Sequence, residues 1–324
     1  MFSIAKASFD WLKTWKSVPV LSWVKAADLY KAGNYEQAAK LYEKGLLKNP
    51  NHKAGSCARL DLAYCLFRLG KYELAKEHLQ AVINRTPSLR EAYVRLARLQ
   101  VWSGQNMDAA WTLRRALREV GPDAEIIGEY LIAVLDNGGP GYLLREALAS
   151  LKKLNREEKQ HQKLEIAAAK LAIFRGELKE GRAKLGRLAS GLEAPFEAVM
   201  AYAEALLEEG RVAHARQQLR RALMVAPQHP RVLSLFAFSY LRNGPFYNAE
   251  YAAQLALSAC QNSGWQSPKE LHILAQAYSA VGRSSEALLV AHRAKEAGSK
   301  LLGNYHDVRT IDVMIADLSK TAEM

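Results

Sequence analysis

The chain has 324 residues, with 45 Lys and Arg against 33 Asp and Glu, and so carries a formal net charge of +12 at pH 7. Its hydrophobic fraction of 49% and charged fraction of 24% are typical of a folded chain and exclude a disordered one. No apolar run approaches the roughly 18 residues of a membrane span, and three cysteines exclude a disulfide framework. The length allows two ordinary domains or one elongated array.

Residues 1–18 are predicted to form an amphipathic helix. Apolar residues recur there with helical spacing, and lysines interrupt them, which argues against a secretory signal peptide. Two interpretations stay open. The helix could cap the first hydrophobic end of the array, or it could contact a membrane interface. The residues available for membrane contact are Phe2, Phe9, Trp11 and Trp15.

From residue 19 onward the sequence repeats with a period of about 34 residues. Glycines that would end a first helix are Gly33, Gly70, Gly104, Gly176, Gly210, Gly244 and Gly282. An alanine stands seven residues before each glycine, and a small residue, such as Ala38, Gly181 or Ala249, stands five residues after it. Small residues let two antiparallel helices approach closely, and glycine ends a helix at little steric cost. A large residue two positions after the glycine, such as Phe246, is expected to fill the wedge between the helices.

The period predicts eight repeats, each a pair of helices. Their expected ranges are 19–52, 56–89, 90–123, 124–160, 162–195, 196–229, 230–263 and 268–300. The fourth repeat is degenerate, and its extra length fits an insertion at residues 137–142, expected to act as a hinge or an interaction tip. In the seventh repeat, Pro245 follows the turn glycine. Residues 301–324 are predicted to form a capping helix and tail, with Val308, Ile311 and Leu318 on one face.

This order of small residues, glycine, aromatic residues and a closing proline resembles the tetratricopeptide repeat. The best-matching segment is WVKAADLYKAGNYEQAAKLYEKGLLKNP, with Ala26, Gly33, Tyr35, Tyr42 and Pro50 in the family's places. The resemblance covers roughly residues 19–300. It implies an all-α fold, a right-handed solenoid of stacked antiparallel helix pairs with capping helices at its ends. It also implies a concave groove lined by the first helix of each pair.

The sequence carries no pattern that requires an enzyme or a cofactor. The motifs HExxH, GxSxG and GxxxxGK[ST] are absent. No two histidines stand four residues apart, and Cys57 and Cys65 lack further metal ligands nearby, so we expect buried thiols rather than a metal site. Basic residues are interspersed with acidic ones, which favours solvated faces over a nucleic-acid surface. We therefore predict no catalytic, cofactor-binding or metal-binding residues.

The resemblance places residues of the first helices in the groove. These are Asp61, Tyr64, Phe67, Arg68, Arg95, Arg98, Trp102, Lys170, Phe174, Phe238 and Arg242. Aromatic side chains together with arginines suit an extended peptide, because they offer apolar pockets and charge-assisted hydrogen bonds. We single out Arg95, Arg98 and Trp102. The alternative is that several of these side chains pack between neighbouring helices.

The leading hypothesis is a non-catalytic scaffold or adaptor, bacterial and cytoplasmic, that binds a protein or peptide segment in the groove. The positive net charge suits an acidic partner. One alternative is an assembly factor for envelope, polysaccharide or secretion machinery, peripheral to the inner membrane and attached through residues 1–18. A weaker alternative is an RNA-binding helical repeat. No small-molecule substrate is evident.

Overall fold

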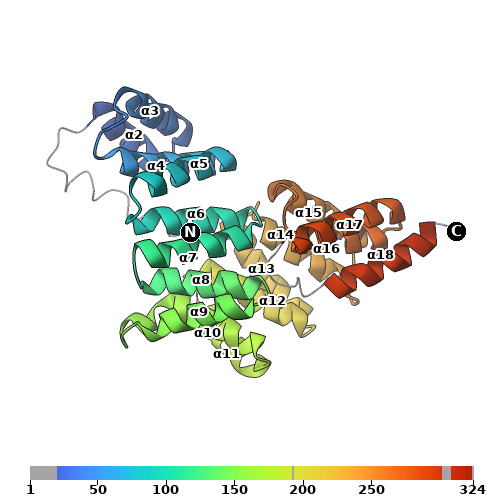
Figure 1. The fold of residues 1–324 in the computed structure, drawn as a ribbon. Coiled ribbons are helices and arrows are strands. Elements are labelled where there is room, and N and C mark those ends of the chain that lie inside the picture. Colours follow the sequence, from blue (N-terminus) through green and yellow to red (C-terminus); the bar gives the residue numbers. More distant parts are fainter. Residues whose placement is uncertain (1–19, 192, 301–307, 323–324) are drawn as a thin grey trace. The chain divides into compact units, whose positions relative to one another are not determined.

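The computed structural model describes residues 20–191, 193–300 and 308–322, and all regular elements in these ranges are helices (Figure 1). The chain divides into two compact modules. The N-terminal module comprises residues 1–99 and 112–121, and the C-terminal module comprises residues 100–111 and 122–324. The predicted membrane-contact residues Phe2, Phe9, Trp11 and Trp15 lie outside the described residues, as does the predicted cap at 1–18. No helix in the described ranges is both long and apolar enough to cross a membrane.

The N-terminal module is built from helix pairs in chain order. Its helices are α2 (Leu21–Lys31), α3 (Tyr35–Lys48), α4 (Gly55–Arg68), α5 (Tyr72–Arg85) and the larger parts of α6 (Arg90–Trp102) and α7 (Asn106–Glu119). The indole of Trp23 is buried and donates a hydrogen bond of 3.3 Å to the carbonyl of Tyr42. A Cβ atom at Gly45 would lie 2.2 Å from the Trp23 Nε1 atom, so only glycine fits there. The first pair is therefore closed by one large indole against a glycine.

The C-terminal module continues the same arrangement. Its helices are α8 (Ala124–Asp136), α9 (Gly141–Lys152), the short η1 (Glu158–Gln160), α10 (Gln162–Phe174), α11 (Leu178–Leu188), α12 (Phe196–Glu208), α13 (Val212–Val225), α14 (Pro230–Leu241), α15 (Ala249–Asn262), α16 (Pro268–Ala280), α17 (Ser284–Ser299) and α18 (Val308–Ala322). Each first helix packs on its own partner, as α12 on α13 and α16 on α17, and on its neighbours in the stack. Figure 1 shows this succession of paired helices from α8 to α18.

Small residues stand where the helices approach most closely. Ala169, Ala203 and Ala275 are fully buried, as the repeat predicted. The turn glycines also behave as predicted. Gly33 has a φ of +80°, a backbone conformation that glycine adopts without strain, and the amide of Asn34 then bonds back to the carbonyl of Leu29 over 2.9 Å. Close helix contact and short turns are thus fixed by the same repeating pattern.

The seventh repeat departs from the expected register. There α14 ends at Leu241, and α15 begins only at Ala249, where the Asn248 side chain accepts a hydrogen bond from the Tyr251 amide over 3.0 Å. Pro245 lacks an amide hydrogen, so the turn cannot close as it does elsewhere. Two expectations are therefore wrong: Phe246 is 37% exposed instead of filling the wedge, and Ala249 is only half-buried.

The last helix, α18, packs against the end of the array. Ile311 and Leu318 are buried in the cluster that also holds Ala294 of α17. Lys295 forms an ion pair of 2.7 Å with Asp312 of α18. The predicted apolar face of this segment is therefore the face that contacts the preceding repeat.

Candidate functional site

In the N-terminal module, three predicted groove residues meet in an aromatic cluster. Tyr64 and Phe67 of α4 join the rings of Tyr30, Tyr35 and Tyr72, with centroid separations of 5.2 to 6.5 Å between successive rings. The Arg68 guanidinium lies 4.6 Å from the Tyr35 ring centroid and donates hydrogen bonds to the Tyr35 and Tyr64 hydroxyls. Arg68 is exposed, so the edge of this cluster is open to solvent.

Two other predicted groove residues of this module are buried, which corrects the expectation that they face a ligand. Asp61 is 1% exposed and accepts a hydrogen bond of 3.2 Å from the Tyr42 hydroxyl. Arg95 is 5% exposed, pairs with Glu91 over 2.7 Å, and donates to the Leu60 carbonyl over 3.1 Å. Both side chains are used between helices, so we leave them out of the proposed binding surface. Arg98 is half-buried.

Trp102, the third residue singled out, belongs to the interior of the C-terminal module. It is 9% exposed, and its ring centroid lies 4.3 Å from that of His229. His229 is the N-cap residue of α14, and its Nδ1 atom accepts a hydrogen bond of 3.1 Å from the Arg231 amide. Burial, and then repulsion from Arg231, lowers the pKa of His229 to about 3, so this imidazole is neutral near pH 7. Trp102 is a packing residue here, which corrects its expected exposure.

Lys170 and Phe174 lie together at a pocket of about 310 Å³ in the C-terminal module. The pocket is lined by Leu135, Asp136, Gly138, Lys170, Ile173, Phe174, Leu185, Ala201, Glu204, Ala205, Glu208 and Lys269. Phe174 is 48% exposed, and its ring lies against Gly139, where a Cβ atom would approach Phe174 Cζ to 2.5 Å. The predicted insertion at 137–142 therefore forms part of the wall of this pocket.

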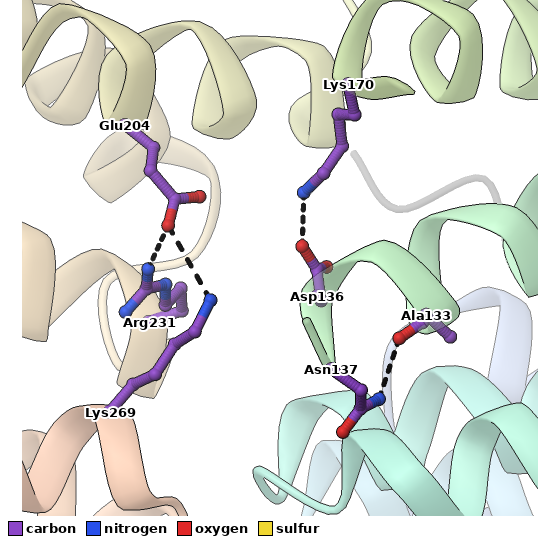
Figure 2. Close-up of polar contacts among 7 residues, drawn as sticks. All are labelled: Ala133, Asp136, Asn137, Lys170, Glu204, Arg231 and Lys269. Carbon is purple, nitrogen blue, oxygen red and sulfur yellow. Dashed lines mark hydrogen bonds and ion pairs between the residues drawn. The ribbon is translucent and has the colours of Figure 1, made fainter. Parts of the chain in front are cut away.

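Ion pairs hold the side chains of Asp136, Lys170, Glu204 and Lys269 at the pocket (Figure 2). Lys170 donates to Asp136, and Glu204 accepts from Arg231 and lies 3.8 Å from the Lys269 ammonium. Burial disfavours the Glu204 carboxylate, but Arg231, Lys269 and Lys170 together hold its pKa below the ordinary value. Burial likewise opposes charge on Lys170, yet the carboxylates of Asp136 and Glu204 raise its pKa. The Glu204 carboxylate and the Lys170 ammonium are therefore both charged at neutral pH.

The Lys170–Asp136 pair follows the repeat period, a signal that was not used in predicting the site from the sequence. Asp136, Lys170 and Glu204 are spaced 34 residues apart. The same spacing separates Glu129, Lys163 and Glu197. The Lys163 ammonium forms an ion pair with Glu129 over 2.9 Å and another with Glu197 over 2.6 Å. Equivalent positions on stacked first helices face one another, so alternating charges at this spacing predict ladders of ion pairs. The alternation of acidic, basic and acidic residues at this spacing in the sequence could have revealed these ion pairs.

Phe238 and Arg242 lie together near the irregular turn of the seventh repeat. The Arg242 guanidinium is 5.0 Å from the Phe238 ring centroid and donates to the Leu207 carbonyl over 3.1 Å. Nearby, the Arg216 side chain is 5% exposed and lies within 5 Å of the rings of Phe236, Tyr240 and Phe246. The solvated faces predicted for the basic residues therefore do not include Arg216, which is buried.

No cluster of His, Cys, Asp and Glu that could hold a metal ion occurs in the described ranges. Burial raises the pKa of the Cys65 thiol to about 12, and of the partly buried Cys57 thiol to about 11. Both thiols are therefore protonated at neutral pH. The described sites offer apolar contacts and fixed charges for binding.

Comparison with known proteins agrees with this architecture. Residues 29–90 match the family described as "Tetratricopeptide repeat". The crystal structure of a tetratricopeptide repeat protein from Parabacteroides merdae is similar, with a TM-score of 0.55 and 15% identity over 79% of this chain and 97% of that chain. A chain of the APC/C hetero-tetramer Cut9-Hcn1 has a TM-score of 0.67 and 11% identity over 94% of this chain and 64% of that chain. At such identities the likeness concerns the fold. No curated protein sequence matches this chain.

Proposed function

We propose that this chain, a tetratricopeptide repeat protein, is a non-catalytic scaffold that binds a segment of another protein at the pocket between α8, α10 and α12. The observation that supports this most is the pocket itself. It combines apolar lining from Ile173, Phe174 and Leu185 with fixed charges from Lys170 and Glu204. Apolar walls with a few well-placed polar groups are characteristic of binding sites.

The partner segment would gain affinity from two sources. Phe174 is half exposed and would bury more apolar surface under a bound side chain. The ion pairs of Lys170 and Glu204 hold their side chains in place before binding, so little side-chain entropy is lost when a partner arrives. The net charge of +12 supports a partner that is acidic overall, through long-range attraction.

The test is to fill the pocket. Ala205 lines it and has little exposed surface, so Ala205→Phe should occupy the volume that a partner side chain would use. Met224, on the outer helix α13, is 86% exposed and gives the matched control Met224→Phe. We expect proteins purified with the intact chain to persist with Met224→Phe and to be lost with Ala205→Phe, both variants keeping wild-type helicity by circular dichroism. Each captured partner is then tested again as a purified protein. Partners unaffected by Ala205→Phe would refute binding at this pocket.

Attachment to the inner membrane for envelope, polysaccharide or secretion machinery is a second proposal, supported by the aromatic and lysine pattern of residues 1–18. Fractionation of the intact chain and of a chain lacking residues 1–18 tests it. Membrane recovery that depends on these residues would support the proposal, and recovery of both in the soluble fraction would refute it. RNA binding remains the weaker prediction, and an affinity that hardly changes with salt would count against it.

A further inference from the structure

The pocket between α8, α10 and α12 contains one carboxylate that takes part in none of its ion pairs. Its lining includes three carboxylates, on Asp136, Glu204 and Glu208, and two ammonium groups, on Lys170 and Lys269. Both ammonium groups are engaged, Lys170 by Asp136 and Lys269 by Glu204, which Arg231 also binds. Glu208 alone among these lining carboxylates forms no ion pair within the described residues.

The dipoles of three helices place further negative charge at the pocket. Three first helices end at the pocket, α8 at Asp136, α10 at Phe174 and α12 at Glu208. The carboxyl end of each helix carries a partial charge of roughly −0.5 from its terminal carbonyl groups. A carboxylate at the end of a helix is disfavoured by this dipole, while a cation there is favoured. The position of Glu208 is therefore one that a positive group would stabilise.

The ionisation of Glu208 agrees with this electrostatic picture. Solvent reaches the side chain, yet partial desolvation, and then repulsion from Glu204, raises the pKa of its carboxyl group. The attraction of Lys269, Lys170 and Arg231 does not fully offset these effects, because these cations serve other carboxylates. A positive group of a ligand placed at Glu208 would give this carboxylate a direct ion pair and favour its charged form.

We propose that the pocket receives a lysine or arginine side chain of the bound protein segment, with its charged end at Glu208 and its aliphatic stem along Ile173 and Phe174. The inference rests on the proposed function and names the chemistry of the contact. This contact is compatible with a partner that is acidic overall. Long-range attraction between the two proteins depends on their summed charges, whereas binding in the pocket depends on a single basic side chain of the partner.

The shape and lining of the pocket favour such an amphipathic side chain over a small cation or an acidic one. Leu135, Ile173, Leu185, Ala201 and Ala205 present apolar surface along the walls. Lysine and arginine bury their methylene stems on such surface and keep the charged head near water. The half-exposed ring of Phe174 can also accept a cation on its face. An acidic side chain would instead meet the unpaired Glu208 carboxylate.

The experiment uses the intact chain and a displayed library of short random peptides as the probe. Glu208→Gln removes the charge with little change of shape, and Glu208→Lys reverses it. Glu165→Gln is the matched control, because Glu165 is an exposed residue of α10 outside the pocket lining. We expect peptides selected by the wild type and by Glu165→Gln to be enriched in lysine or arginine. Glu208→Gln should lose this enrichment and Glu208→Lys should select acidic residues.

Individual peptides give the quantitative readout. The dissociation constant of a selected basic peptide should rise about tenfold in Glu208→Gln, as expected for loss of one charge-assisted contact, and remain unchanged in Glu165→Gln. Peptides that Ala205→Phe blocks, but that show no basic enrichment or bind Glu208→Gln equally well, would overturn this inference and leave the proposed function standing. If Ala205→Phe blocks none of the selected peptides, or none are selected, both the inference and the proposed function are overturned.

Discussion

Mild acid should destabilise the C-terminal module through His229. This side chain is 7% exposed, contacts the rings of Trp102 and Phe196, and uses its unprotonated Nδ1 atom to accept the Arg231 amide hydrogen. Protonation would remove the acceptor and place a positive charge beside the Arg231 guanidinium. The folded protein therefore requires the neutral imidazole.

The sign and size of the effect follow from the difference in proton affinity. The pKa of His229 is about 3 in the folded protein and 6.5 in the reference state. Between these values the unfolded chain binds more protons, so stability is complete above pH 6.5 and falls as the pH decreases. With about 1.4 kcal/mol for each unit of difference, lowering the pH from about 7.5 to 5.0 should reduce the free energy of unfolding by about 2 kcal/mol.

Urea denaturation at these two pH values measures the loss. His229→Asn keeps a side-chain acceptor at the start of α14 but cannot titrate, so its loss should be smaller than that of the wild type by about 2 kcal/mol. His214→Asn, at an exposed position, should behave as the wild type does. A residual loss is expected in every variant, because burial, and then Arg59, lowers the pKa of His78 in the N-terminal module. An equal loss in His229→Asn and the wild type would refute the reasoning.

Two further predictions concern packing within the C-terminal module. Lys163→Met should lower the free energy of unfolding by about 3 kcal/mol, because it leaves the carboxylates of Glu129 and Glu197 without their shared cation. The control Lys184→Met breaks only an exposed pair and should change the free energy of unfolding by less than about 0.5 kcal/mol. Equal effects of the two variants in urea denaturation would contradict this prediction. Gly181→Ala should destabilise by about 1–3 kcal/mol, since the new Cβ atom would lie 2.6 Å from Ile173 Cγ1. The control Gly141→Ala has open space around the new Cβ atom and should be neutral or slightly stabilising. Thermal unfolding of the two variants measures the difference.

The fold was predictable because its determinants recur. Ala203 and Gly210 stand at the same spacing as their equivalents in other repeats. The alanine allows close contact between helices, and the glycine allows a tight turn. Both requirements concern a single helix pair and can therefore be predicted from a short stretch of sequence. The seventh repeat shows the limit of this reasoning. Pro245 was visible in the sequence, but the delayed start of α15 depends on how Asn248 and Tyr251 close the turn.

The candidate site was predicted less well, because it depends on contacts between repeats. A first-helix position does not reveal whether an arginine faces solvent or a neighbouring carbonyl, and Arg95 bonds the Leu60 carbonyl, 35 residues earlier. Lys170 and Phe174, which were predicted to line the groove, line the pocket, whereas Glu204 and Glu208 were not among the predicted site residues. The charge alternation that includes Glu204 emerges only when equivalent positions of stacked helices are compared at the period of 34 residues.

The pocket forms where the sequence departs from its own repeat. In the fourth repeat, the inserted turn places Gly139 under the Phe174 ring, which a larger residue would displace. In the fifth repeat, Gly181 replaces the alanine usual at its position, where a Cβ atom would collide with Ile173, another lining residue. In the sixth repeat, the apolar part of the wall consists of two small side chains, Ala201 and Ala205. A regular array would fill the space between its helices with equivalent side chains, so the departures in the fourth and fifth repeats, beside small side chains of the sixth, leave room for a partner's side chain.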